Sequence, residues 1–169
     1  IEKIRKVDFE TNEPQLKKNL KEVIKNGYFI PQLKITEADI YIICVPTPFE
    51  KKKEKNQIPA PNLNYVYDAA KSISQVVKEN NLVLLESTSP VGTTNNIATL
   101  ISQESGISLD KLNVAYCPER VIPGNIFGEL VNNDRVVGGL TDKASQHSKN
   151  LYKLFCQGEI IVTEARTAE

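Results

Sequence analysis

Three short stretches of the sequence combine proline with hydroxyl or charged side chains. Residues 45–48 read Val-Pro-Thr-Pro, residues 86–94 read Glu-Ser-Thr-Ser-Pro-Val-Gly-Thr-Thr, and residues 117–124 read Cys-Pro-Glu-Arg-Val-Ile-Pro-Gly. Proline fixes the backbone of a turn, and hydroxyl or charged groups can hydrogen-bond a ligand. A single turn of this kind can simply stop a strand and cap the next helix. Three of them on one edge of a sheet would suit a bound cofactor.

The second of these stretches also contains the start of a predicted helix. Gly92 precedes Thr93 and Thr94, and we expect one of the two threonines to cap the helix. Free amides and the helix dipole at such a start favour an anion, for example a phosphate. The sequence contains no Gly-x-Gly-x-x-Gly spacing, however. The residues alone therefore predict a polar edge of the sheet that could bind a ligand, and they do not indicate which reaction would occur there.

The three cysteines give no sign of metal or redox chemistry. Cys44, Cys117 and Cys156 are widely spaced, and none belongs to a Cys-x-x-Cys or Cys/His pattern. Free cysteine usually behaves as a small buried apolar residue. We therefore expect all three to be buried, and we predict no metal site.

Each of the three polar turns follows an apolar segment that is typical of a buried parallel strand. These segments are residues 39–45, 81–85 and 112–116. Apolar residues at helical spacing separate them, at residues 65–79 and 94–103. The alternation predicts an α/β fold with a Rossmann-like, doubly wound parallel sheet and right-handed crossovers. The three turns should then meet at the carboxyl edge of the sheet.

Further elements flank this central pattern. Apolar residues at helical spacing predict helices at residues 14–25 and 143–155. Runs of β-branched residues predict strands at residues 135–138 and 159–163. The first dozen residues are polar and carry no clear pattern. Residues 48–61 form a loop with a run of charges, for which a solvated surface loop is favoured over a substrate lid.

The composition excludes several classes of protein. The chain has 169 residues and is 40% apolar, which is enough for one sizeable core. Its 21 basic and 21 acidic residues balance, which argues against a nucleic-acid partner. No window reaches the roughly 18 apolar residues of a membrane span, so we expect no membrane partner and a cytoplasmic location. The lack of methionine predicts that the sequence is part of a longer chain.

The same three turns, together with Asn-Asp-Arg-Val-Val-Gly-Gly at residues 133–139, resemble the UDP-glucose/GDP-mannose dehydrogenase family. The likeness extends over residues 20–169 and is greatest to the branch that acts on UDP-N-acetylmannosamine. It implies that residues 1–169 are the second half of an NAD-binding domain. The glycine loop of the first βαβ unit, a central helix and a C-terminal UDP-binding domain would lie outside this sequence.

The resemblance also assigns roles to five residues. It implies that Thr47 and Thr88 contact NAD, that Arg120 and Val121 contact the UDP-sugar, and that Glu119 lies near the reacting carbon and assists catalysis. Members of the family oxidise the C6 alcohol of the sugar to the uronate, with two hydride transfers to NAD and a cysteine-linked intermediate.

Other features of the family limit what this stretch could do. The catalytic cysteine belongs to a Gly-Gly-His-Cys motif that is absent here, and the catalytic lysine would lie just past Glu169, so we predict no turnover by these residues alone. Pro123 stands where UDP-glucose enzymes carry a second glutamate, which makes UDP-glucose a less favoured substrate. The alternatives are a sister dehydrogenase of UDP-N-acetylglucosamine or UDP-glucose, and a noncatalytic nucleotide-sugar binding module. The resemblance further implies a homo-oligomer.

Overall fold

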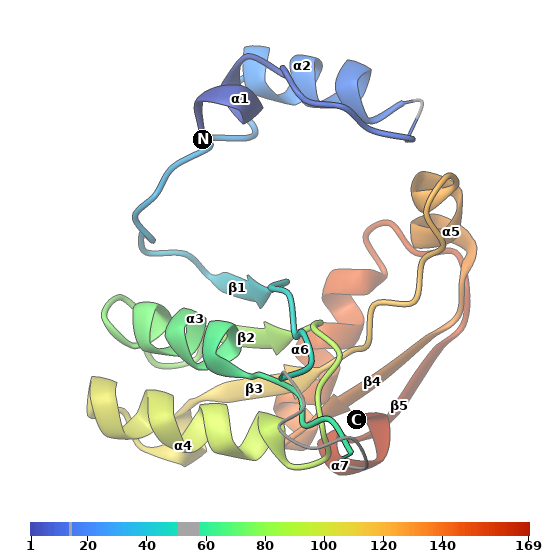
Figure 1. The fold of residues 1–169 in the computed structure, drawn as a ribbon. Coiled ribbons are helices and arrows are strands. Elements are labelled where there is room, and N and C mark those ends of the chain that lie inside the picture. Colours follow the sequence, from blue (N-terminus) through green and yellow to red (C-terminus); the bar gives the residue numbers. More distant parts are fainter. Residues whose placement is uncertain (14, 51–57) are drawn as a thin grey trace.

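A computed structural model describes residues 1–13, 15–50 and 58–169 of the chain. Within these residues five strands form one sheet in the order β1-β2-β3-β4-β5 (Figure 1). The strands are β1 (Ile40–Ile43), β2 (Leu82–Leu85), β3 (Asn113–Tyr116), β4 (Arg135–Gly139) and β5 (Ile160–Glu164). The charged run, for which a solvated loop was favoured, falls largely on residues 51–57 and lies outside the described residues.

Helices cover both faces of the sheet. α3 (Asn64–Ser74) and α4 (Thr93–Ser105) pack on one face, and α6 (Asp142–Tyr152) packs on the other (Figure 1). The shorter elements are α1 (Glu2–Arg5), α2 (Leu16–Lys25), η1 (Leu109–Lys111), α5 (Ile126–Asn132) and α7 (Ala165–Ala168). None of the helices in the described ranges has the length and apolar character needed to cross a membrane.

Strand β2 shows why the sheet needs cover on both sides. Its side chains alternate between the two faces, as the pleat of a strand requires. Val83 and Leu85 join the core cluster under α3 and α4, whereas Leu82 and Leu84 join the cluster under α6. All four are at most 2% exposed. The continuous apolar run that predicted a buried parallel strand is therefore confirmed.

The direction of the strands confirms the predicted α/β fold and corrects one part of it. β1, β2 and β3 are parallel, and β4 and β5 are parallel to each other, but β4 runs antiparallel to β3. A parallel neighbour requires a connection that crosses the sheet. The segment after β3 does not cross, and its helix α5 lies on the side toward which β1 and β2 point (Figure 1). The chain therefore re-enters the sheet from that end in the opposite direction.

Several helix boundaries differ from the sequence prediction, and two of the differences have a clear cause. α3 ends at Ser74 rather than near residue 79, because the amides of Val76 and Val77 both donate to the carbonyl of Ile73, at 3.0 and 2.9 Å, and tighten the last turn. α4 begins at Thr93 with Gly92 as its N-cap residue, at a φ of 97°. The prediction that a threonine side chain caps this helix is therefore wrong.

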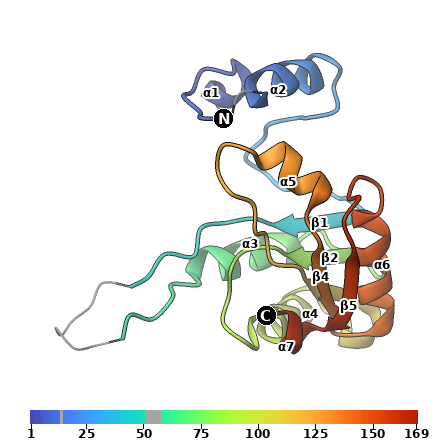
Figure 2. The same ribbon diagram turned by 90° about the vertical axis from the view of Figure 1, so that its right-hand side faces the viewer.

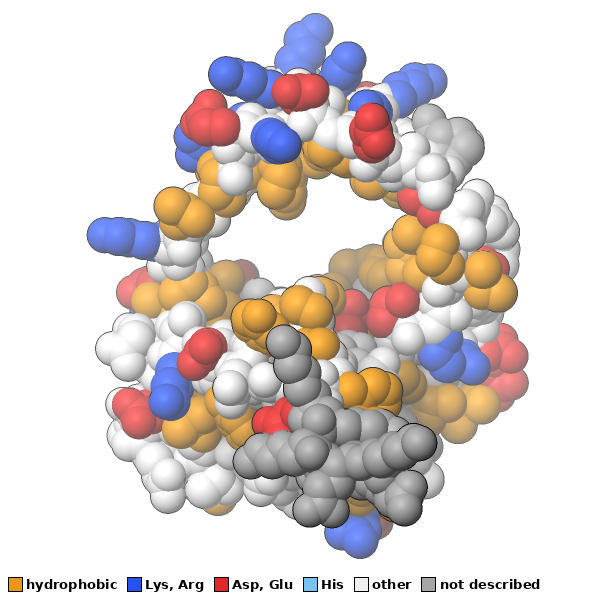
Figure 3. Space-filling model, viewed as in Figure 1, with side chains coloured by type: hydrophobic (Ala, Val, Ile, Leu, Met, Phe, Trp, Pro, Cys, Tyr) orange, Lys and Arg blue, Asp and Glu red, His pale blue; other side chains and the backbone are white. Residues whose placement is uncertain are grey.

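The N-terminal segment lies apart from the sheet and joins it through residues 26–39 (Figure 2). It contacts the rest of the chain through Glu13, whose carboxylate accepts hydrogen bonds from the amides of Gly124 and Ile126 at the start of α5. Hydrophobic side chains line the inner side of this segment and Lys and Arg gather on its outer side (Figure 3). Across from it, Ile40 and Ile42 on β1 are 38% and 47% exposed.

Candidate functional site

The carboxyl ends of β1, β2 and β3 lie level with one another. Ile43 pairs with Leu85, and Leu85 pairs with Tyr116, so the last residues of the three strands are in register. The hydrogen-bond ladder continues past these ends, from the Glu86 amide to the Ile43 carbonyl and from the Cys117 amide to the Leu85 carbonyl, both at 3.0 Å. The three polar turns therefore begin side by side, as predicted.

Two further contacts hold the turns together. The Ser87 hydroxyl accepts a hydrogen bond from the Val45 amide at 2.8 Å and donates to the Val45 carbonyl at the same distance. The Glu119 amide donates to the Glu86 carbonyl at 3.3 Å. Ser87 thus fixes the first turn to the second, and the backbone of Glu86 fixes the second to the third.

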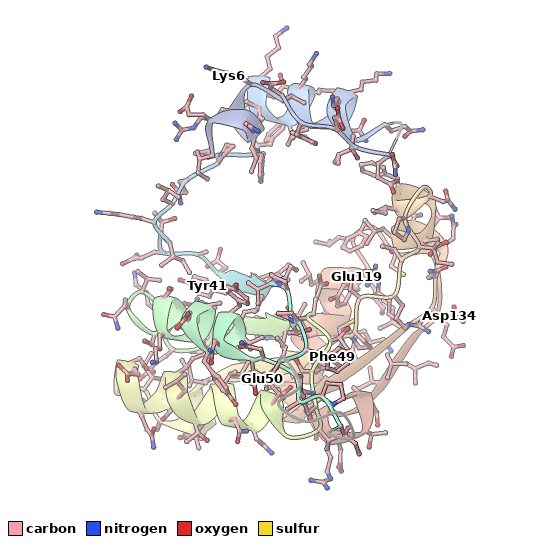
Figure 4. The ribbon with its side chains drawn as sticks, viewed as in Figure 1. Lys6, Tyr41, Phe49, Glu50, Glu119 and Asp134 are labelled. Atoms are coloured by element: carbon pink, nitrogen blue, oxygen red, sulfur yellow. The ribbon has the colours of Figure 1, made fainter. Side chains whose placement is uncertain are left out.

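A pocket of about 290 Å³ opens between these turns. Its lining comes from all three of them and consists of Cys44, Val45, Pro46, Thr47, Glu86, Ser87, Thr88 and Glu119. Thr88 and Glu119 are exposed, Thr47 is half-buried, and Glu119 lies on the chain between β3 and α5 (Figure 4). The structure therefore brings three of the five predicted site residues to one place.

The other two predicted site residues, Arg120 and Val121, follow on the same loop but do not line the pocket. The Val121 amide donates to Oε1 of Glu119 at 2.5 Å. The Arg120 guanidinium is exposed and donates to the carbonyl oxygen of Asp134. Glu119 thus uses one carboxylate oxygen to order the loop that carries both residues.

Two pocket residues, Cys44 and Glu86, were not predicted as site residues. The Cys44 thiol donates to Oε2 of Glu86 at 3.1 Å, and the hydroxyl of Tyr152, which is 1% exposed, donates to Oε1. The sequence did contain a signal for Glu86. It directly follows the buried run of β2, where a carboxylate must find hydrogen-bond partners.

The environment of Cys44 keeps its side chain neutral. Although the residue as a whole is exposed, the thiol packs into the pocket wall, and burial raises its pKa to about 12, with added effect from the charges of Glu86 and Glu119. Because the thiolate is the nucleophilic form of cysteine, Cys44 is a weak nucleophile at neutral pH.

The other two cysteines differ from Cys44 in their surroundings. Cys117 is buried, which raises the pKa of its thiol, and Cys156 is half-buried. The prediction that all three cysteines are buried is therefore confirmed only for Cys117. It is wrong for Cys44 because that residue follows an edge strand, which within the described residues has a neighbouring strand on one side only.

The start of α4 is not free to bind an external anion. The amides of Gly92 and Thr94 donate to the carboxylate of Glu169, at 2.6 and 2.7 Å, and the Thr94 hydroxyl donates to the same carboxylate at 2.7 Å. The helix start does attract an anion, as its dipole predicts. The anion is the Glu169 side chain of the chain itself rather than a bound phosphate.

Across the parts of the chain that the structure describes, no group of three or more His, Cys, Asp or Glu side chains could hold a metal ion.

Comparison with known proteins identifies this arrangement. The NAD binding domain of the UDP-glucose/GDP-mannose dehydrogenase family matches residues 1–156. The UDP-N-acetyl-D-mannosamine dehydrogenase of Campylobacter jejuni is 46% identical over 155 residues, which is 87% of this chain and 37% of that protein. The NDP-N-acetyl-D-galactosaminuronic acid dehydrogenase of Ralstonia solanacearum is 43% identical over 165 residues, or 93% of this chain and 38% of that protein.

Solved structures agree with the sequence comparisons. The UDP-D-ManNAc dehydrogenase of Pyrococcus horikoshii superposes with a TM-score of 0.90 at 35% identity, and the match covers 99% of this chain and 40% of that one. The chain thus spans about two fifths of the length of the proteins it matches. It belongs to the UDP-glucose/GDP-mannose dehydrogenase family, because the family model matches most of the chain.

Proposed function

We propose that the protein containing this chain oxidises the C6 alcohol of UDP-N-acetylmannosamine to the uronate, with NAD as the hydride acceptor. The observation that carries the proposal is the meeting of Thr47, Thr88 and Glu119 in one pocket at the carboxyl ends of three parallel strands. Ligands of open α/β sheets bind at this edge. The names of the relatives at 46% and 35% identity supply the substrate.

The pocket suits one end of the cofactor. Its volume of about 290 Å³ lies at the low end of the range for small-molecule sites, which supports binding of the nicotinamide part rather than the whole dinucleotide. The hydroxyls of Thr47 and Thr88 are the hydrogen-bonding groups that we assign to it. When bound, NAD supplies the acceptor for the hydride that leaves C6. The phosphates need another site, because Glu169 occupies the start of α4.

Glu119 is the residue that we place nearest to the reacting carbon. One of its carboxylate oxygens orders the loop through the Val121 amide, and the other has no hydrogen bond within the described ranges. A carboxylate on the pocket wall can hold the proton of a substrate hydroxyl or of water. Arg120 and Val121 follow directly and would bind the UDP-sugar where the loop leaves the pocket.

The domain assignment is part of the same proposal. We infer that residues 1–169 are a partial NAD-binding domain, and that the glycine loop, the central helix and the UDP-binding domain belong to other parts of the protein. Two observations support this. The chain spans about two fifths of its relatives. In addition, β1 is apolar on both faces, as a central strand would be, yet it lies at the edge of the sheet.

The test is NADH formation by the full-length protein with NAD and UDP-N-acetylmannosamine, followed by absorbance. We expect two NADH for each sugar nucleotide consumed and a uronate as the product. Faster turnover of an N-acetylgalactosamine nucleotide would favour the second candidate, which the 43% identity to the Ralstonia solanacearum enzyme supports. Saturable binding of the UDP-sugar without any NADH would reject the enzyme and leave a binding module.

A further inference from the structure

The carboxylate of Glu169 joins two parts of the chain that are 75 to 77 residues apart in sequence. It accepts three hydrogen bonds, from the Gly92 amide, the Thr94 amide and the Thr94 hydroxyl, all between 2.6 and 2.7 Å. Thr94 is fully buried and Glu169 is half-buried. Hydrogen bonds to an ionised carboxylate are stronger than neutral ones, and the helix dipole adds to them.

The end of the contact that carries Glu169 is held rigidly against the sheet. A Cβ atom added at Gly138 of β4 would lie only 2.4 Å from the carbonyl oxygen of Glu164, so the backbone enters α7 in close contact with β4. Ala165 is 4% exposed, and the Glu169 amide donates to its carbonyl at 2.9 Å. The carboxylate is therefore presented from a fixed position.

The other end of the contact belongs to the turn that carries Thr88. Ser87 anchors the start of this turn to Val45, and the Ser89 hydroxyl donates to the Ser87 carbonyl at 2.9 Å. Glu169 anchors its far end at Gly92 and Thr94. Thr88 therefore lies between two fixed points and on the wall of the pocket.

We propose that Glu169 is a positioning residue for NAD: its carboxylate holds residues 89–94 in the conformation that presents Thr88 to the pocket. The inference rests on the proposed function, since it assumes that Thr88 contacts the cofactor. Glu169 itself does not line the pocket and acts through the turn. Its loss should therefore weaken NAD binding more than it slows the chemical step.

The kinetic test compares Glu169→Ala, Glu169→Gln and Glu164→Gln in the full-length protein. We expect Glu169→Ala to raise KM for NAD about tenfold, as the loss of one strong interaction would, with a smaller change in kcat. Glu169→Gln should recover part of the loss, because its amide oxygen still accepts a hydrogen bond. Glu164→Gln removes the same charge from an exposed side chain nearby and should leave both constants unchanged.

Hydrogen exchange at the amides of residues 92–94 provides a readout that does not need activity. We expect faster exchange in Glu169→Ala and no change in Glu164→Gln. Faster exchange with an unchanged KM for NAD would make Glu169 a helix cap only and overturn the proposal, as would an equal rise of KM in the Glu164→Gln control.

If Glu169→Ala does not fold, the same two measurements on Glu169→Gln and Thr94→Val replace it, with the same outcomes for and against the proposal. A wild-type protein that forms no NADH would reject the proposed function and with it any role of Glu169 in NAD binding, whereas the exchange rates would still report the cap.

Discussion

The carboxylate of Glu86 accepts hydrogen bonds from two different elements. Cys44 reaches it from the end of β1, and Tyr152 reaches it from α6 on the far side of the sheet. Burial raises the pKa of the Cys44 thiol to about 12, and the charge and hydrogen bond of Glu86 add to this rise. Glu86 therefore helps to keep Cys44 in the thiol form.

Replacing Glu86 with glutamine should make Cys44 more reactive. Loss of the negative charge lowers the thiol pKa, so at a fixed pH below about 12 the thiolate fraction rises, about tenfold for each unit by which the pKa falls. The rate of alkylation of Cys44 by iodoacetamide, followed by peptide mass spectrometry, measures this. Glu104→Gln, on the exposed side of α4, is the matched control. Equal rates in the two variants would show that burial alone sets the pKa.

The sequence predicted some residues of the site, whereas others became visible only in the structure. Thr47, Thr88 and Glu119 were predictable as neighbours, because each follows an apolar strand segment and parallel strands end at one edge. The contacts of Glu86 and Glu169 were not, because their partners lie between 42 and 77 residues away in the sequence. No periodic pattern encodes such contacts, which depend on the finished packing of the elements.

At the scale of elements, the contact between β4 and the start of α7 depends on Gly138. The missing side chain lets the backbone at Glu164 and Ala165 approach, and a Cβ atom would lie 2.4 to 2.8 Å from their backbone atoms. The backbone of two paired strands cannot move aside as the end of a flexible side chain can. Gly138 therefore sets the distance at which α7 packs on the sheet.

Gly138→Ala should destabilise the fold by about 1–3 kcal/mol, the usual cost of overpacking. The measurement is urea unfolding, in which the midpoint should fall. Gly128→Ala in α5 is the matched control, because the atoms nearest to its Cβ belong to the side chain of Asn125, which can move, and alanine favours a helix by about 1 kcal/mol over glycine. A midpoint for Gly138→Ala as high as that of the control would contradict the close approach.

The sequence predicted most elements and missed one orientation. All five strands, together with α2, α3, α4 and α6, lie where apolar periodicity placed them, with ends that shift by a few residues. The prediction for α3 ran too far because Val76 and Val77 continue the helical spacing in a turn, and Val77 still packs in the core. The reversal at β4 was not readable, because a strand has the same side-chain pattern in either direction.

At the scale of the whole molecule, the resemblance to the family implies that two catalytic groups lie outside this sequence. We predict that a protein of residues 1–169 forms no NADH from NAD and UDP-N-acetylmannosamine. The catalytic lysine and the Gly-Gly-His-Cys motif that the resemblance implies are not among these residues, and the pKa of Cys44 makes that residue a poor substitute nucleophile.

Absorbance measurements on this protein, beside the full-length protein as the positive control, provide the check. NADH formation above the rate without protein would refute the prediction, and a Cys44→Ser variant would then show whether that thiol is responsible.

The edge position of β1 has a consequence for handling the isolated chain. Its outer N–H and C=O groups face no other strand within the described residues, and Ile40 and Ile42 stand exposed beside them. Such an edge is a template on which a second chain can add a strand. Two copies that meet there would extend the sheet, so residues 1–169 should aggregate more as their concentration rises. A lysine substitution on β1 should reduce this aggregation.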